Sequence, residues 1–179
     1  HYAFNSMEEG RFKVSVDASK RTEREVYLRH FKDCIEAGAA SVMSAYNRYK
    51  GTYLGEHKYM LRDVLKGEWD FDGFVVSDFI WGTKSTVDAA NNGLDVEMCN
   101  TFYYGDKLVQ AVKENKVDES VIDEAALRIV RTLIAAAEAE DPETYEHSVI
   151  SCGAHIALAK KAAAKAMTLI KNENQVLPL

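Results

Sequence analysis

The first hundred residues alternate between short apolar runs and segments of helical periodicity, which limits the folds open to the chain. Segments 41–46 and 74–78 are uncharged until their ends and partly β-branched or aromatic. Such runs are typical of strands buried on both faces. Segment 94–98 is a weaker third run. Strand, helix and strand at this spacing predict βαβ units, and therefore an α/β fold with a parallel sheet.

Apolar side chains recur at helical spacing between and after these runs. The pattern predicts a helix over 21–37, capped by Gly38, and a second around 60–65, ended by Gly67. Further helices are predicted at 108–112, 122–139 and 151–170. Segment 171–179 is expected to leave the last helix in extended form.

Composition narrows the class of protein. The 179 residues are 47% hydrophobic and 28% charged, which predicts a globular unit. A net charge of −6 without charge blocks argues against nucleic-acid binding. The absence of a run of about 18 apolar residues argues against a membrane span. We expect a soluble protein, cytoplasmic in preference to secreted.

Cofactor and metal motifs are missing from the sequence. Cys34, Cys99 and Cys152 are odd in number and unpaired in spacing, which argues against a disulfide framework and a zinc site. We therefore expect them to be small buried or half-buried hydrophobes. No histidine lies at ligand spacing beside the acidic clusters, and phosphate-binding glycine loops are lacking. The sequence therefore predicts neither metal nor cofactor.

Ligands of parallel α/β proteins bind at the carboxyl ends of strands. Asp78 closes one predicted strand, while Met43 and Tyr46 lie at the equivalent end of another. A helix cap is the alternative for Asp78, and core packing is the alternative for Met43. Asp95 and Glu97 form either a carboxylate pair or two acceptors for backbone donors.

Several motifs in order resemble glycoside hydrolase family 3, which contains β-glucosidases and related exo-acting β-glycosidases. They are HYAFNSMEEGR (1–11), SVMSAYN (41–47), EWDFDGFVVSD (68–78) and GLDVEM (93–98). Segment 169–179 is similar to the family's passage into its second domain. The resemblance implies that residues 1–170 form the C-terminal half of a (β/α)₈ TIM-type barrel domain. Residues 171–179 would then be a linker toward an α/β sandwich domain.

The resemblance also assigns roles to residues at the strand ends. Asp78 matches the nucleophile that forms a covalent glycosyl-enzyme, and His1 matches a histidine that binds sugar hydroxyls. Met43 and Tyr46 match residues lining the innermost sugar subsite. Phe79 stands where many members carry a tryptophan that stacks on sugar, and nearby Trp81 is a second candidate for that contact.

Two departures from the family pattern matter. Cys99 replaces a proline that usually follows the Glu-Met pair. The acid/base glutamate of two-domain members lies in the second domain, so these 179 residues alone are expected to lack ordinary turnover of β-linked glucosides or oligosaccharides.

Two other readings stay open. One is a non-catalytic half-barrel that assembles with the missing remainder of the enzyme or with itself. The other is transglycosylation or phosphorolysis by the same nucleophile.

Overall fold

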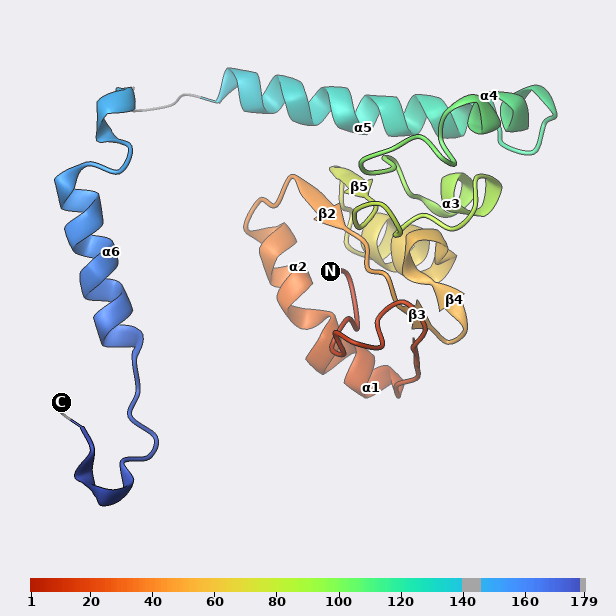
Figure 1. Ribbon diagram of the computed structural model, residues 1–179. Coiled ribbons are helices and arrows are strands. Elements are labelled where there is room, and N and C mark those ends of the chain that lie inside the picture. Colours follow the sequence, from red (N-terminus) through yellow and green to blue (C-terminus); the bar gives the residue numbers. More distant parts are fainter. Residues whose placement is uncertain (140–145, 178–179) are drawn as a thin grey trace. The chain divides into compact units, whose positions relative to one another are not determined.

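The computed structural model describes residues 1–139 and 146–177. The chain forms two compact units, His1–Glu138 and Ala139–Leu179. Every strand that the structure describes belongs to the first unit (Figure 1). That unit therefore holds all of the predicted strand-end residues.

Two parallel strands form the centre of the first unit. β2 (Ser41–Met43) pairs with β5 (Phe74–Val76), and the two lie side by side in Figure 1. Single parallel bridges extend the pair on both sides, from Tyr2 to Ser44 and from Val76 to Val96. Four chain segments thus neighbour one another in sequence order and run in one direction. This confirms the predicted parallel α/β arrangement.

The paired strands are shorter than the sequence predicts. β2 and β5 each pair over three residues, within apolar runs that span 41–46 and 74–78. The third run, 94–98, contributes only the bridge at Val96. An apolar run indicates which residues are buried, whereas the length of a ladder depends on where the partner backbone turns away.

A second small sheet is absent from the sequence prediction. β1 (Ser15–Val16) pairs in parallel with β3 (Arg48–Tyr49), which pairs antiparallel with β4 (Thr52–Tyr53). Gly51 allows the intervening turn with a φ of +90°. Two-residue strands are too short to produce a recognisable alternation. This sheet ties the N-terminal segment to the loop that follows β2.

The predicted helix over 21–37 is present in three consecutive pieces, and Gly38 follows with a φ of +98°. The pieces are α1 (Lys20–Thr22), η1 (Glu23–Tyr27) and α2 (Arg29–Glu36). The second helix, η3 (Tyr59–Glu68), has the wider turns of a π-helix, as does η1. Gly67 lies inside η3, so the predicted stop there is wrong. Its φ is not positive, and it therefore lacks the left-handed geometry that ends helices.

Three further helices complete the first unit. Two predicted helices are confirmed, α4 (Asp106–Lys113) and α5 (Glu119–Glu138). Each begins a few residues earlier than predicted. α3 (Val87–Asn92), which was not predicted, ends at Gly93 with a φ of +106°. A single short turn, η2 (Leu54–Glu56), precedes η3.

The core fills the space between the parallel strands and the helices α2 and η3. Tyr2 is fully buried, and its hydroxyl donates a hydrogen bond to the Met60 carbonyl at 3.0 Å. Its ring packs edge-on against Phe31 of α2, at 5.2 Å between centroids. Leu61 and Val75 are equally buried in the same cluster. Anchoring of Tyr2 fixes the backbone next to His1.

The expectation of buried or half-buried cysteines is wrong for two of the three. Cys34 and Cys99 are exposed, and Cys152 is half-buried. All three are free thiols. Cys34 lies on α2 away from the core contacts, and Cys99 lies in the loop after Val96, so burial was decided by the neighbours of each residue.

The second unit contains η4 (His147–Val149), α6 (Gly153–Ala166) and η5 (Glu173–Gln175). α6 ends four residues before the predicted position 170. Met167, Leu169 and Ile170 are exposed, so no packing extends the helix to them. Segment 171–177 contains the short turn η5 where an extended chain was expected, and residues 178–179 lie outside the described part. No helix in the described ranges is long and apolar enough to cross a membrane.

Candidate active site

The carboxyl ends of the parallel segments bring three of the predicted residues to one edge. The Tyr2 N–H donates to the Met43 carbonyl at 2.8 Å, and the parallel bridge from Tyr2 to Ser44 places His1 level with Met43, the last residue of β2. Met43 itself is paired with Val76, two residues before Asp78. His1, Met43 and Asp78 therefore come together although they lie far apart in sequence.

Asp78 has a buried carboxylate with unequal oxygens. The residue is only 4% exposed. Its Oδ1 accepts a hydrogen bond from the Phe79 N–H at 2.8 Å. Its Oδ2 lies 3.1 Å from His1 Nε2 but accepts no well-directed hydrogen bond from the described residues. The His1 side chain is 40% exposed, so the site is open to solvent on that side.

Tyr46 lies beside this carboxylate and is also buried. Its hydroxyl donates to the Phe79 carbonyl at 2.6 Å and so fixes the backbone that follows Asp78. Burial, and next the nearby Asp78 carboxylate, raise the pKa of Tyr46. The phenol therefore stays protonated near neutral pH and can act as a donor.

Aromatic rings surround the opening. Phe79 and Trp81 are 46% and 54% exposed, so both offer a face or edge to a ligand. Phe12 packs between Tyr46 and Trp81, at centroid distances of 4.8 and 5.5 Å. The Arg11 guanidinium lies over the Phe12 and Tyr46 rings. Sequence reasoning missed Phe12, although its position directly after the Arg11 motif was an available signal.

Asp95 and Glu97 do not form a shared carboxylate site. Asp95 accepts from Lys66 Nζ and from the Val75 N–H, both at 2.7 Å. Glu97 Oε2 accepts from the backbone N–H groups of two successive residues, Tyr103 and Tyr104. The hydrogen-bonding alternative is therefore the one observed. Within residues 1–139 and 146–177, no group of three or more acidic, histidine or cysteine side chains could hold a metal ion.

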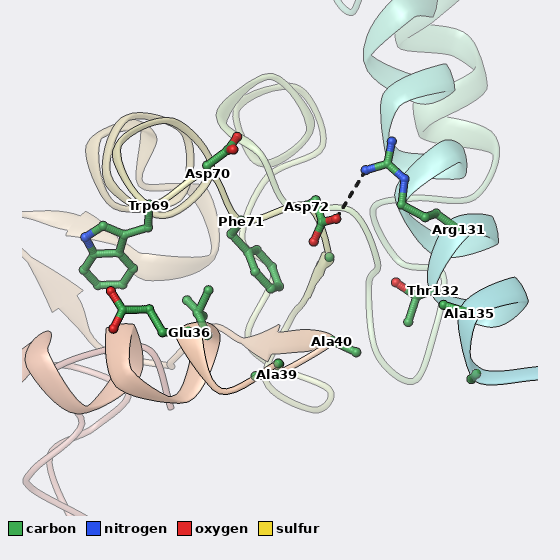
Figure 2. Close-up of a pocket in the computed structure, with 14 residues that line it drawn as sticks. Glu36, Ala39, Ala40, Trp69, Asp70, Phe71, Asp72, Arg131, Thr132 and Ala135 are labelled. Atoms are coloured by element: carbon green, nitrogen blue, oxygen red, sulfur yellow. Dashed lines mark ion pairs between the residues drawn. The ribbon is translucent and has the colours of Figure 1, made fainter. Parts of the chain in front are cut away.

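A cavity of about 610 Å³ lies at the opposite end of the same strands (Figure 2). Ala40 and Gly73, which directly precede β2 and β5, line it. Arg131 of α5 reaches toward Asp72 across it, at 3.7 Å. Because ligands of parallel sheets bind at the carboxyl ends of strands, the edge with Asp78 is the better candidate.

An acidic side chain at a parallel strand end, flanked by imidazole, phenol and exposed aromatic rings, suits the binding and cleavage of a sugar. The comparisons with known proteins agree with this class. The model of the glycosyl hydrolase family 3 N-terminal domain matches residues 1–132. The chain therefore belongs to glycosyl hydrolase family 3.

Its relatives are β-glucosidases. The chain is 40% identical to thermostable beta-glucosidase B of Acetivibrio thermocellus, and the match covers 100% of the chain and 23% of that protein. It is 39% identical to beta-glucosidase B of Emericella nidulans, over 100% of the chain and 21% of that protein. The crystal structure of DesR, a beta-glucosidase from Streptomyces venezuelae in complex with D-glucose, matches with a TM-score of 0.83 and 30% identity. That match covers 100% of the chain and 24% of DesR. The chain thus spans less than a quarter of the length of these three relatives.

Proposed function

We propose that Asp78 is the nucleophile of a retaining β-glucosidase that acts on terminal β-D-glucosyl residues. The observation that carries the proposal is the buried carboxylate at the end of β5, with Oδ2 free of a directed hydrogen bond and facing the half-exposed His1. A carboxylate nucleophile needs one oxygen free to approach the anomeric carbon. The relatives named beta-glucosidase supply the substrate class.

In the first step the carboxylate oxygen forms a bond to the anomeric carbon, and the bond to the leaving-group oxygen breaks. A separate acid delivers a proton to that oxygen. In the second step the conjugate base of that separate acid removes a proton from water. The water oxygen then forms a bond to the anomeric carbon, and the bond from that carbon to Asp78 breaks. The sugar is released with its original configuration, and the carboxylate is restored.

The neighbours of Asp78 would form the innermost sugar subsite. His1 lies within hydrogen-bonding reach of a ligand seated on the carboxylate, and Met43 and Tyr46 would line the same pocket. Phe79 and Trp81 would stack on sugar faces, because exposed aromatic rings suit the apolar faces of sugars. The packing of Phe12 against Trp81 supports this, since it holds the indole ring in place.

We further propose that the proton donor lies outside these 179 residues, on a later domain or a partner chain. Asp95 is engaged by Lys66 and a backbone N–H, so it is poorly suited to proton transfer. The four parallel segments, in sequence order, fit an arc of a (β/α)₈ barrel of which residues 1–170 would be the C-terminal half. Residues 171–179 would lead toward a second domain. By this proposal the chain alone shows no ordinary turnover.

Covalent trapping tests the nucleophile. The longest natural polypeptide that contains these residues is treated with an aryl 2-deoxy-2-fluoro-β-glucoside, and the labelled peptide is mapped by mass spectrometry. We expect one label, on Asp78, and none in the Asp78→Asn variant. Asp72→Asn is the control and keeps the label, because the Asp72 side chain is 77% exposed and lies at the opposite end of β5. A label on any other residue would overturn the assignment.

A further inference from the structure

The loop after β5 turns back beneath the proposed nucleophile. The Gly82 N–H donates to the Asp78 carbonyl at 3.1 Å, and the Trp81 N–H donates to the Phe79 carbonyl at 2.8 Å. Gly82 is buried in this turn. A Cβ atom at Gly82 would lie 2.6 Å from the Asp78 backbone nitrogen and 2.9 Å from its carbonyl carbon. Cβ atoms essentially never come within 3.0 Å of a heavy atom outside their own residue and its two chain neighbours, so only glycine allows this closure without a shift of the backbone.

A second glycine, Gly55, packs directly against the backbone of Gly82. Gly55 of η2 is buried against the Gly82 carbonyl, and a Cβ atom there would come within 3.3 Å of the Gly82 carbonyl carbon and closer still to its oxygen. η2 is held firmly in place. The Glu56 carbonyl accepts from Asn92 at 2.8 Å, and the Glu56 carboxylate accepts from Ser85 at 2.6 Å. The backbone of Gly55 thus contacts that of Gly82, which in turn contacts that of Asp78. Hydrogen bonds from Asn92 and Ser85 hold η2 in place beneath this contact.

We propose that Gly82, supported by Gly55, is a positioning residue for the nucleophile. The absence of a side chain at both positions lets the Asp78 backbone settle where its carboxylate can reach the anomeric carbon. This inference rests on the proposed role of Asp78. A misplacement of about 1 Å in a reacting group can reduce a rate about 10²-fold. A methyl group at Gly82 must shift either the loop or Asp78, because the atoms that it meets belong to the backbone.

Gly73 provides a matched control at the other end of β5. A Cβ atom there would lie 2.6 and 2.8 Å from ring atoms of Phe71, and closer still to the Ala40 carbonyl oxygen. The packing conflict thus includes one backbone atom and the ring of a buried side chain, whereas at Gly82 all three close atoms are backbone. Gly73 lies next to the cavity at the amino ends of the strands, away from the nucleophile. A purely structural effect of a glycine-to-alanine change is expected at both positions, whereas an effect on Asp78 is expected only at Gly82.

The experiment compares Gly82→Ala, Gly55→Ala and Gly73→Ala in the longest natural polypeptide that contains these residues. Each is labelled with 2,4-dinitrophenyl 2-deoxy-2-fluoro-β-glucoside. The amount of released dinitrophenolate counts the folded sites, and the rate constant at saturation reports bond formation at Asp78. The half-saturating concentration reports binding, and calorimetry gives the thermal midpoint.

For Gly82→Ala we expect the saturating rate constant to fall about 100-fold, because the carboxylate is displaced. For Gly55→Ala we expect about a 10-fold fall, because its effect passes through Gly82. Gly73→Ala should lower the thermal midpoint as Gly82→Ala does, while its remaining folded sites react within about twofold of the natural rate. Half-saturating concentrations should change less than the rate constants.

A natural labelling rate in Gly82→Ala, or an equal slowing in Gly73→Ala, would overturn the inference. If Gly82→Ala fails to fold, Gly55→Ala decides, with a natural rate at full amplitude contradicting the role. A label away from Asp78 in the natural sequence would instead refute the proposed function. The two failures are therefore distinguishable.

Discussion

Asp78 and Glu23 are both buried carboxylates, yet their surroundings differ. Glu23 is 0% exposed, and its oxygens accept from the Tyr49 hydroxyl at 2.5 Å and the Tyr59 hydroxyl at 2.6 Å. Lys20 Nζ donates to it at 3.1 Å. Burial acts to raise the pKa of Glu23, but these donors outweigh it and hold the pKa below its usual value. Asp78 accepts one backbone hydrogen bond and leaves an oxygen beside His1.

The difference separates carboxylates that hold the fold from one that is available for chemistry. A carboxylate with all of its oxygens engaged stabilises the elements around it, and its removal leaves donors unsatisfied. Asp95, engaged by Lys66 and a backbone N–H, belongs with Glu23. Glu97 is intermediate, because two backbone N–H groups donate to its Oε2 while its Oε1 has no partner among the described residues.

Replacement of Asp78 should have the largest effect on activity. In the longest natural polypeptide, Asp78→Ala is expected to lower hydrolysis of an aryl β-glucoside by at least about 10⁴-fold, because the nucleophile is lost. The free energy of unfolding should change by less than about 1 kcal/mol, because few native hydrogen bonds are removed. Steady-state kinetics and denaturant titration measure both. Activity within 10-fold of the natural protein would contradict the comparison.

The buried pair of Lys66 and Asp95 should show the largest effect on stability. Both side chains are 4% exposed, so Lys66→Met leaves the Asp95 charge without its partner. We expect a loss of about 3–5 kcal/mol, the usual cost of breaking a buried ion pair.

Lys32→Met is the control for that change, because Lys32 is 44% exposed and pairs with Glu36 on one helix face. Its effect should stay below about 1 kcal/mol. Urea unfolding monitored by circular dichroism measures both variants. Similar midpoints for the two would show that the buried pair does not hold the fold.

Glu23→Gln tests the carboxylate whose two oxygens both accept hydrogen bonds. The amide turns an NH₂ group toward hydroxyl donors, so we expect a loss of about 1–3 kcal/mol in unfolding free energy. The rate of covalent labelling at Asp78 should stay within about twofold. Glu25→Gln is the matched control, because Glu25 is 61% exposed and its pairing with Arg21 contributes little. A large fall in the labelling rate of Glu23→Gln would contradict the purely structural role of Glu23.

The smallest effect is expected from His57, which lies near Glu23. Burial lowers the pKa of His57 below its usual 6.5, while the Tyr49 carbonyl, Glu23 and Asp63 act in the opposite direction. The unfolded chain therefore binds the proton more tightly, so stability is full above pH 6.5 and falls as the pH decreases through the folded-state pKa.

We expect a loss below about 1 kcal/mol between pH 7 and pH 5, because the ring is partly exposed. His57→Gln should remove this slope in unfolding measurements over that range. An unchanged slope in the variant would assign the pH dependence to another group.

The sequence by itself determined the parallel α/β class, the positions of most helices and the family. Apolar runs and helical spacing are local properties, and the motifs are read in order along the chain. The strand-end position of Asp78 also followed from the sequence, because it depends only on where one apolar run stops.

Only the tertiary structure decided which partners each buried charged group has. Tyr49 and Tyr59 are remote from Glu23 in sequence, and Lys66 is remote from Asp95. Phe12 beside Trp81 and Gly55 beneath Gly82 likewise depend on how loops meet. Periodicity shows which face of an element is buried, but the partner of a buried polar group is set by the packing of distant segments.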